Sequence, residues 1–448
     1  MDMDVVIVGG GLGGLALAVG LRERGIKAQV YERAAENRHN TGTAISIGHN
    51  GINALESIQP GLALDQMGEF GSYTRILSSI LPGVTPGEKD IVTRSAIPPG
   101  RMLMIPWKEA RDVLVQNLDP AMIHYRHTFV HYTPIQGGIE VYFDVKEEEE
   151  KNMDDFTSVS KSREKVVCAK LLVGADGVWS QVRQIMIGDK PRDLKLVLWN
   201  AIVHNPDSAL FKLHEKDELK FIGMGGKRVG FLMDVGTSIL LRDGLGAERT
   251  LWQLRAPDED GELARTRKTD LEVHGQNALK MRVLKHVKGP ELAFKAVEEA
   301  IEATDPQSIW ERNLYDRLPL EKWTDPSGHV VLIGDAAHGM HPGPGEGART
   351  TFEDAHQLSI LLHNVFSTSD WNDKLHKALT QFEEVRIPRL RRIQAYAAEL
   401  TGFRELIPDW VLELPLEEKL RRSLEFSEWT QTYPKNITGD AASTYWKP

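Results

Sequence analysis

The residues with the clearest chemical role are three glycines near the start of the chain. Gly9, Gly11 and Gly14 stand at the spacing G-x-G-x-x-G, directly after the apolar run 5–8 and before a helical pattern that begins at Leu12. In this arrangement the first glycine makes a tight turn, the second lets the backbone approach a pyrophosphate, and the third lets the helix pack close to the strand. The helix N-terminus then attracts the anion. We therefore expect a dinucleotide site here.

An acidic residue completes this site. Residues 28–32 form the second predicted strand of a βαβ unit, and Glu32 ends it about 20 residues after the middle glycine. A carboxylate at this position accepts a hydrogen bond from a ribose 2′-hydroxyl and repels a 2′-phosphate. The site is therefore expected to hold FAD or NAD and not NADP.

Two later segments also place glycine and aspartate at the ends of predicted strands. The segment 174–177, Gly-Ala-Asp-Gly, follows the predicted strand 165–173. Asp335 follows the predicted strand 329–333, and the glycine-rich run 343–347 leads from there towards a helix predicted over 352–366. Because the ends of parallel strands meet at one edge of a sheet, these segments can contribute to one site.

The order and spacing of these segments resemble the single-component (class A) FAD-dependent monooxygenases, the aromatic-hydroxylase family with the 4-hydroxybenzoate hydroxylase fold. The resemblance implies an α/β fold, with a Rossmann-like FAD-binding domain, a mainly antiparallel β-sheet substrate lobe and a C-terminal helical segment. The implied boundaries are 1–73, 100–183 and 319–400 for the FAD-binding domain, 74–99 and 184–318 for the substrate lobe, and 401–448 for the tail.

The resemblance also implies roles for individual residues. It places Asp335 at the ribityl chain of FAD, Pro342 beside the reactive carbon of the ring, and the backbone of Ala348 against the ring. It places Arg33 near the adenosine end, and Asp176 in a fingerprint that touches FAD and the nicotinamide cofactor. The amides that follow the glycine-rich run face the flavin edge where negative charge develops on reduction.

Arg111 is a charged residue on an otherwise apolar helical stripe. Trp107, Arg111, Leu114 and Leu118 follow one another at helical spacing. Unpaired burial of a charge is costly, so we expect the FAD pyrophosphate or ribityl chain to be the partner of Arg111. Alternatives are an alignment that puts Trp107 at this position, and an arginine that covers apolar surface with its stem. The expected FAD-binding residues are Gly9, Gly11, Leu12, Gly14, Glu32, Arg33, Arg111, Asp176, Asp335, Pro342, Gly345, Gly347 and Ala348.

Three residues near the glycine-rich run depart from the family pattern. Glu346 stands where glutamine is usual, and Arg349 stands where asparagine is common. Each either brings a charge close to the flavin or points away from it. His341 is also unusual, and we interpret it as a solvated or capping histidine without a catalytic role.

The resemblance implies that the cofactor carries the chemistry. NADH or NADPH reduces the flavin, O₂ adds to give a C4a-hydroperoxyflavin, and one oxygen atom passes to an aromatic or polycyclic small molecule by hydroxylation or epoxidation. The protein then has to orient the substrate and exclude water. No catalytic side chain is assigned. Alternatives are a halogenase or reductase on the same fold, although residues 410–415 do not match the halogenase motif, and a non-catalytic flavin-binding interaction protein.

The substrate lobe is predicted from residues 194–257, which alternate between apolar and polar side chains. The charged segment 258–290 is expected to bridge to a helix over 291–304. His204 or Arg242 could assist a phenol proton, but nothing singles either of them out. Core packing and contact with the substrate are equally compatible with the candidate lining residues, which are Trp199, Phe221, Met224, Phe231 and Met233.

Composition narrows the class of protein further. The chain has 448 residues, 41% hydrophobic and 26% charged, and a net charge of −10, which argues against nucleic acid as a partner. No apolar stretch is long enough for a membrane span, and the start shows no basic leader, so we expect a cytoplasmic protein. We expect it to be a monomer or a homodimer. A single cysteine, Cys168, excludes an internal disulfide, and no metal-ligand motif is present, so we expect no metal.

Overall fold

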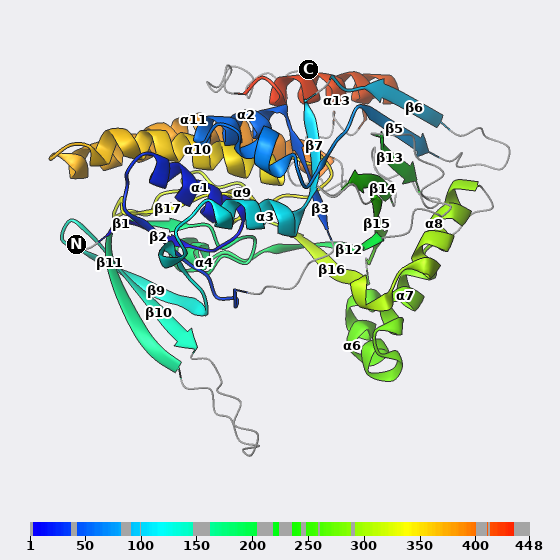
Figure 1. The fold of residues 1–448 in the computed structure, drawn as a ribbon, viewed down its shortest axis with the longest axis horizontal. Helices are drawn as coiled ribbons and strands as arrows, with labels where there is room; N and C mark the ends of the chain where they lie inside the picture. Colours follow the sequence, from blue (N-terminus) through cyan, green and yellow to red (C-terminus); the bar gives the residue numbers. More distant parts are fainter. Residues whose placement is uncertain are drawn as a thin grey trace, which may run out of the picture.

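The computed structural model describes residues 3–36, 43–81, 91–98, 100–146, 162–203, 218–223, 235–242, 248–258, 260–287, 292–399, 410 and 413–433. Within these residues the chain forms three β-sheets, a layer of long helices and a separate group of shorter helices (Figure 1). The expected α/β class is confirmed, with the dinucleotide unit at one end and the second sheet at the other.

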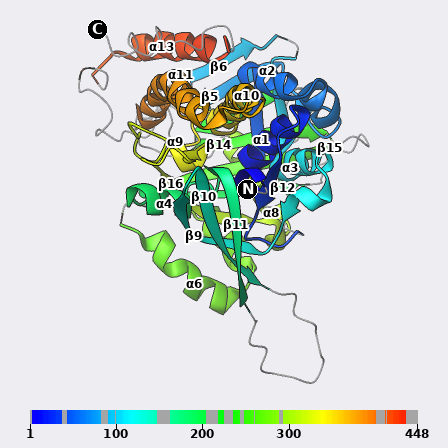
Figure 2. The same ribbon diagram turned by 90° about the vertical axis from the view of Figure 1, so that its left-hand side faces the viewer.

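The first sheet is made of β1 (Met3–Val8), β2 (Ala28–Tyr31), β8 (Ile123–His124), β9 (His127–Ile135), β10 (Gly138–Lys146), β11 (Ser162–Gly174) and β17 (Val330–Leu332). Its order is β8-β2-β1-β11-β10-β9, with β17 also on β11. β1 runs parallel to β2 and β11, and β17 runs parallel to β11. The early part of β11 pairs antiparallel with β10, so this one strand joins the parallel core to a hairpin that projects away from it (Figure 2).

The helices beside the first sheet include a pair, α1 (Leu12–Glu23) and α10 (Gly347–Phe366), that pack on each other through small residues. The others are α2 (His49–Ile58), α3 (Trp107–Gln116), α4 (Gln181–Ile187), α9 (Asp335–His338) and α11 (Trp371–Glu399), with a π-helical turn at Leu62–Met67 and 3₁₀ turns at Pro120–Met122 and Pro306–Ser308. A Cβ on Gly13 would come within 2.5 Å of Thr351, and one on Gly20 within 3.0 Å of Ser359. The two glycines therefore allow α1 to lie directly against α10.

The second sheet consists of β5 (Ile76–Leu81), β6 (Ile91–Ala96), β12 (Arg192–Val203), β13 (Glu218–Gly223), β14 (Val235–Arg242), β15 (Glu248–Pro257) and β16 (Trp310–Asp316). Its order is β16-β12-β15-β14-β13-β5-β6. The pairs described are antiparallel except β13 with β5, which is parallel. A small third sheet of β3 (Ala44–Gly48), β4 (Ser72–Tyr73) and β7 (Met102–Pro106), in the order β3-β7-β4, lies between the two larger ones.

One face of the second sheet is covered by α6 (Glu262–His274), α7 (Asn277–Leu284) and α8 (Leu292–Ala303). The charged segment 258–290 leads to α8, and α6 and α7 occupy most of it. No residue of α6 is fully buried, and its Leu263 and Leu271 pack partly buried against the core of the second sheet. The expected helix at 291–304 is confirmed as α8.

The last described helix, α13 (Leu416–Thr430), lies against the layer of α10 and α11 in both views (Figures 1 and 2). Phe426 stacks on Tyr396 of α11 with ring centroids 3.9 Å apart. Among the described helices, none is long and apolar enough to cross a membrane.

Candidate functional site

Three segments distant in sequence meet at one edge of the first sheet. The amide of Gly9 donates to Tyr31 O (2.9 Å), the amide of Ala175 donates to Val8 O (2.8 Å), and the amide of Ile333 donates to Gly174 O (3.0 Å). These bonds place the glycine turn, the Gly-Ala-Asp-Gly segment and the approach to Asp335 side by side. The late strand therefore ends two strands away from the opening βαβ unit.

The glycine turn has the geometry of a nucleotide cradle. Gly9 has φ of +113°, and a Cβ there would lie 2.3 Å from Ala175 O. A Cβ on Gly14 would lie 2.1 Å from Gly9 O, so only glycine permits this approach of helix to strand. Around Gly11, by contrast, a Cβ would meet nothing within 4 Å. The surface beside Gly11 and the buried Leu12 that starts α1 is therefore open, as the approach of a pyrophosphate requires.

Glu32 is held against this turn. Its side chain is 7% exposed, and its Oε2 accepts from the amide of Gly10 (2.7 Å) while its Oε1 accepts from the amide of Ala34 (2.8 Å). Each carboxylate oxygen keeps a second lone pair, so the fixed carboxylate can still accept a ribose hydroxyl. The side chain of Arg33 is exposed, and no contact described here brings it to the turn.

Arg111 reaches the same turn from α3. Its side chain is buried, its Nε donates to Gly10 O (3.1 Å), and its Nη2 lies 3.4 Å from the hydroxyl of Tyr125. The partners of this buried charge are thus the backbone of the glycine turn and, at 3.8 Å, the carboxylate of Asp112. The guanidinium lies where a bound phosphate would add a second partner of opposite charge.

Asp176 organises the segment after β11. Its Oδ1 accepts from the hydroxyl of Ser180 (2.6 Å), and its Oδ2 accepts from the amides of Gln181 (2.7 Å) and Val182 (3.2 Å). Burial raises the pKa of the Asp176 carboxyl, and these hydrogen bonds oppose that rise. In this structure Asp176 stabilises the start of α4.

The same segment is tied to α9 through Arg183. This arginine is fully buried and donates to Ala336 O (3.1 Å) and Ala337 O (2.9 Å). It also forms an ion pair with Asp189 (2.5 Å). The second segment therefore fixes the position of the third.

Asp335 presents its carboxylate at the start of α9. The side chain is exposed, yet the protein around it raises the pKa of its carboxyl group, an effect opposed by His338 and by Arg312 on β16. Arg312 is likewise exposed while desolvation lowers its pKa. Exposure together with desolvation indicates a recessed surface. The positive charge of Arg312 and the proximity of His338 favour the ionised form of the Asp335 carboxyl group.

The start of α10 adjoins Asp335. A Cβ on Gly347 would lie 3.9 Å from Asp335 Oδ1, and Gly345, with φ of +68°, closes a turn onto Pro342 O (3.0 Å). The first helical bond of α10 is made by the amide of Thr350, so the preceding amides of Gly347 and Ala348 lie at the open N-terminal end. The structure thus brings Asp335, Pro342, Gly345, Gly347 and Ala348 together.

The opposite charges of Glu346 and Arg349 neutralise each other. Both are buried, and Arg349 Nη1 donates to Glu346 Oε1 (2.9 Å). Arg349 also donates to Ser46 O (2.9 Å), and Asn50 of α2 donates to Glu346 Oε2 (2.9 Å). The two departures from the family pattern therefore form one neutral pair that binds α10 to β3 and α2.

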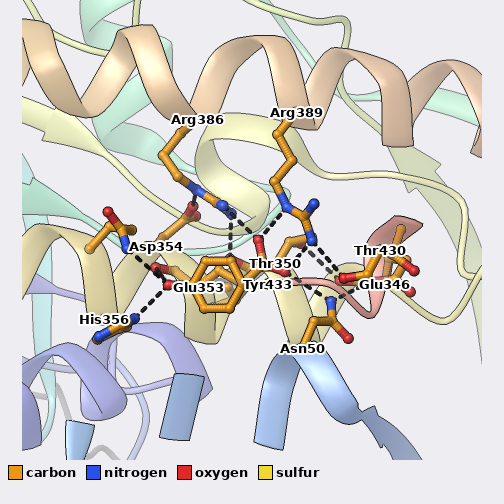
Figure 3. Close-up of polar contacts among 12 residues, drawn as sticks. Asn50, Glu346, Thr350, Glu353, Asp354, His356, Arg386, Arg389, Thr430 and Tyr433 are labelled. Carbon is orange, nitrogen blue, oxygen red and sulfur yellow. Dashed lines mark hydrogen bonds and ion pairs between the residues drawn. The ribbon is translucent and has the colours of Figure 1, made fainter. Parts of the chain in front are cut away.

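A buried ionic network continues from this pair towards the C-terminal segment (Figure 3). Asn50 also donates to Glu353 (2.9 Å), which forms ion pairs with Arg386 (2.6 Å) and Arg389 (2.7 Å) of α11. Arg389 donates in turn to Thr430 O (2.9 Å). These guanidinium groups hold the pKa of Glu353 at about 2, against the effect of burial.

The neighbouring acidic residue of α10 ties the same network to the third segment. Asp354 Oδ1 accepts from Arg386 (2.8 Å), while its Oδ2 accepts from the amide of Gly334 (2.9 Å) and contacts His338 Nε2 (2.7 Å). Asp335 directly follows Gly334. The network therefore fixes the turn that presents Asp335.

His341 is buried and not solvated, so of its two expected roles the capping one is found. Its Nδ1 accepts from the amide of Gly343 (3.0 Å), and its Nε2 lies 3.2 Å from Arg255 Nη1 on β15. Burial and the charge of Arg255 lower the pKa of His341 well below its usual value, so the imidazole is neutral.

The expected substrate residues lie in different places. Trp199 is fully buried in the core between the second sheet and its helices, where its Nε1 donates to Glu311 (2.6 Å). This corrects the expectation for Trp199, which points away from the strand positions that face His341 and Asp335. Phe221 stands on β13 opposite Thr237. Outside the described residues lie His204, Met224, Phe231 and Met233.

Sequence reasoning missed Arg255 and Arg312. In the sheet, Leu198 of β12 pairs with Arg255 on one side and Arg312 on the other. Directly opposed residues share a face, so the two arginines stand on the same face about 10 Å apart. The alternation of apolar and polar side chains along β15 and β16 was the available signal. This alternation does not tell which face of the sheet meets the nucleotide-binding unit.

Among the described residues, no group of three or more His, Cys, Asp and Glu side chains is placed to hold a metal ion. The polar groups that converge are backbone amides and an arginine, which donate, and two carboxylates, which accept. This set fits a dinucleotide with a long linker, with a pyrophosphate at the first helix and a ring system at the start of α10.

Comparison with known proteins agrees with a dinucleotide-binding protein. The chain matches the family described as "FAD binding domain" over residues 2–272 and 294–388, and so belongs to it. It is 27% identical over 408 residues to a zeaxanthin epoxidase of Oryza sativa subsp. japonica, across 88% of this chain and 54% of that protein. It is 25% identical over 399 residues to 3-hydroxybenzoate 6-hydroxylase of Klebsiella oxytoca, across 87% and 86%.

The relatives differ from this chain in length, and solved structures share its fold. The chain spans about half the length of the zeaxanthin epoxidases it matches. Solved structures show the same fold: Klebsiella pneumoniae HpxO with FAD and uric acid has a TM-score of 0.67 at 21% identity, over 99% of this chain and 96% of that one. For 2,6-dihydroxypyridine-3-hydroxylase from Arthrobacter nicotinovorans the TM-score is 0.64 at 16% identity, over 90% and 94%.

Proposed function

We propose that this chain is an NAD(P)H-dependent FAD monooxygenase that inserts one oxygen atom of O₂ into an aromatic or polycyclic small molecule, by hydroxylation or epoxidation. The observation that carries the proposal is the meeting of the glycine turn, Glu32 and Asp335 at one sheet edge, beside the start of α10. The names of the relatives, which include hydroxylases, epoxidases and monooxygenases, support it.

The residues that would hold FAD divide into two groups. The open face at Gly11, the N-terminus of α1 and Arg111 would bind the pyrophosphate, while Glu32 would accept from the adenosine ribose. At the other end, Asp335 would accept from the ribityl hydroxyls, and the amides of Gly347 and Ala348 would face the ring. When bound, the flavin supplies hydride acceptance and the activation of O₂.

The protein's own contribution is placement and charge. The amides at the start of α10 stabilise negative charge next to them, because they lie at the positive end of a 20-residue helix. The Glu346–Arg349 pair keeps net charge away from this end. The Asp335 carboxylate acts as a fixed acceptor, since the turn that carries it is tied to Asp354.

The proposal also includes the domain boundaries, the localisation, the oligomeric state and one substrate contact. The FAD-binding domain would span 1–73, 100–183 and 319–400, and the substrate lobe 74–99 and 184–318, with 401–448 as a tail. We propose a cytoplasmic monomer or homodimer. Phe221, on β13 of the second sheet, stays a candidate for contact with the substrate.

The proposal is tested with purified protein. We expect bound FAD in the visible spectrum, and oxidation of NADH or NADPH coupled to O₂ uptake when a suitable aromatic compound is added. With ¹⁸O₂, one labelled oxygen atom should appear in the product. Asp335→Asn serves as the loss-of-cofactor control. Protein that binds FAD but oxidises neither nicotinamide cofactor across an aromatic library would contradict the monooxygenase and support the non-catalytic alternative.

A further inference from the structure

Two charged side chains lie at the N-terminal end of α10, next to the amides that are proposed to face the flavin ring. Glu346 directly precedes the first helical residue, Gly347, and Arg349 stands in the first turn. Their side chains belong to residues that are 2% and 5% exposed, so both charges are withdrawn from water. A buried charge acts on its neighbours over several ångströms, because little solvent screens it. The charge balance at this end of the helix therefore affects any group that is bound there.

The guanidinium of Arg349 is held in a defined position. It donates to the backbone oxygen of Ser46 (2.9 Å) and to the hydroxyl of the same residue on β3. A Cβ on Gly48 would come within 2.7 Å of Nη1, and one on Gly345 within 3.5 Å of Nη2. The guanidinium thus fills the space between the end of β3 and the turn that leads into α10. It lies beside Gly345, two residues before the helix begins.

Glu346 supplies the countercharge of this arginine. Its Oε1 accepts from Arg349 Nη1 (2.9 Å), and its Oε2 accepts from Asn50 Nδ2 (2.9 Å). Both oxygens act as acceptors, as they do in an ionised carboxylate. Asn50 also donates to Glu353, which has countercharges of its own on α11. Within the part of the chain that the structure describes, the ion pair with Glu346 is the one that offsets the charge of Arg349.

We infer that Glu346 keeps the reduction potential of the bound FAD low, because it offsets the positive charge that Arg349 brings to the start of α10. This inference deepens the proposed function and rests on it, since it assigns the pair to the cofactor of that enzyme. Negative charge develops on the flavin ring when it is reduced, so a positive charge beside it stabilises the reduced form. With the pair intact, the helix end contributes its dipole but no net side-chain charge. The exposed charges nearby, Asp335 and Arg312, are of opposite sign as well.

The test measures the potential in a double-mutant cycle. FAD-loaded proteins are reduced in equilibrium with a reference dye of known potential, and the visible spectra give the two forms of each. Glu346→Gln leaves Arg349 uncompensated and should raise the potential by at least about 30 mV, which is a tenfold shift in a two-electron equilibrium. Arg349→Asn leaves Glu346 uncompensated and should lower the potential. The double variant carries the neutral residues that are usual at these positions, and its potential should return close to the wild-type value.

The cycle distinguishes an electrostatic role from a structural one. A pair that only held α10 in place would lower FAD retention and stability in each variant, without shifts of opposite sign that cancel in the double variant. Arg421→Gln, which removes a charge from exposed α13, should keep the wild-type potential. An unchanged potential in Glu346→Gln overturns the inference, and so does a double variant that stays as far from the wild type as Glu346→Gln. Should Glu346→Gln not retain FAD, equal potentials in Arg349→Asn and the double variant overturn it.

The outcomes also separate this inference from the proposed function. Shifts that cancel in the double variant, in a protein that never oxidises NAD(P)H, would retain the role of Glu346 and contradict the monooxygenase. Substrate-dependent O₂ uptake by a protein whose potential does not respond to Glu346→Gln would retain the monooxygenase and overturn the inference. Wild-type protein that binds no FAD would contradict both.

Discussion

Two charged regions lie on either side of the late glycine-rich segment, and they differ in how their charges are matched. Behind it, Glu346, Glu353 and Asp354 each face guanidinium groups at hydrogen-bonding distance. In front of it, Arg255 Nη1 lies 3.2 Å from Nε2 of the buried His341. The first region joins buried opposite charges, whereas the second joins a half-buried arginine to a neutral imidazole. The difference indicates that the first region contributes more to stability, because removal of one partner there leaves a buried charge uncompensated.

The largest change in stability is expected from a substitution in the buried ionic network of α10 and α11. Arg386→Met should lower the free energy of unfolding by roughly 3–5 kcal/mol, because Glu353 and Asp354 both lose a partner while fully buried. Denaturant unfolding of the holoenzyme measures the change. Arg421→Met removes an arginine from exposed ion pairs and should change stability by less than about 1 kcal/mol. Similar losses in both variants would remove the distinction between the two regions.

The stability of the buried region should also depend on pH through His356 of α10. The ring of His356 contacts the hydroxyl of Tyr433. Burial lowers its pKa from 6.5 to about 4. As the pH falls, the imidazole of His356 therefore takes up a proton in the unfolded chain before it does so in the folded protein. The contribution of neutral His356 to stability is complete above pH 6.5 and is lost as the pH falls to 4. The loss is at most about 3 kcal/mol.

Unfolding measured between these pH values checks the contribution. His356→Gln should be less sensitive to acid than the wild type over that range. His363→Gln, at an exposed position of the same helix, should keep the wild-type dependence. Identical slopes in all three proteins would exclude His356 as a source of acid sensitivity.

On the cofactor side, Glu32→Ala should weaken FAD binding by about 1–3 kcal/mol, since a charged acceptor for the ribose is lost together with two bonds that hold the turn. Titration of the apoprotein with FAD measures the affinity. Arg33→Ala, next in sequence but exposed, should have little effect. An unchanged affinity in Glu32→Ala would remove this residue from the site.

The smallest effect is expected at the sheet face that points away from the site. Trp199→Phe should lower stability by about 1 kcal/mol through loss of the bond to Glu311, which keeps its ion pair with Arg282. KM for the substrate should not change, as steady-state kinetics can show. A large rise in KM with unchanged stability would return Trp199 to the substrate site.

Elements specified by neighbours in sequence were predicted more closely than elements that depend on distant contacts. Residues 5–32 were predicted closely, because the strand, the glycine turn and the helix are specified by neighbours in sequence. The start of α10 was expected at 352 and lies at Gly347. Glycine and threonine are poor helix formers, so the local pattern gave no signal, and contacts of Arg349 with Ser46 and Glu346 stabilise that first turn instead.

By itself, the sequence determined the class of cofactor and the order of the segments around it, since the glycine spacing, Glu32 and the strand before Asp335 are local patterns with one physical interpretation. Only the tertiary structure decided which charges are matched. Strand register set Arg255 and Arg312 on one face and Trp199 on the other, and packing set His341 against Arg255. A shift of one residue in register reverses the face of every side chain, and no local pattern encodes which face meets the cofactor domain.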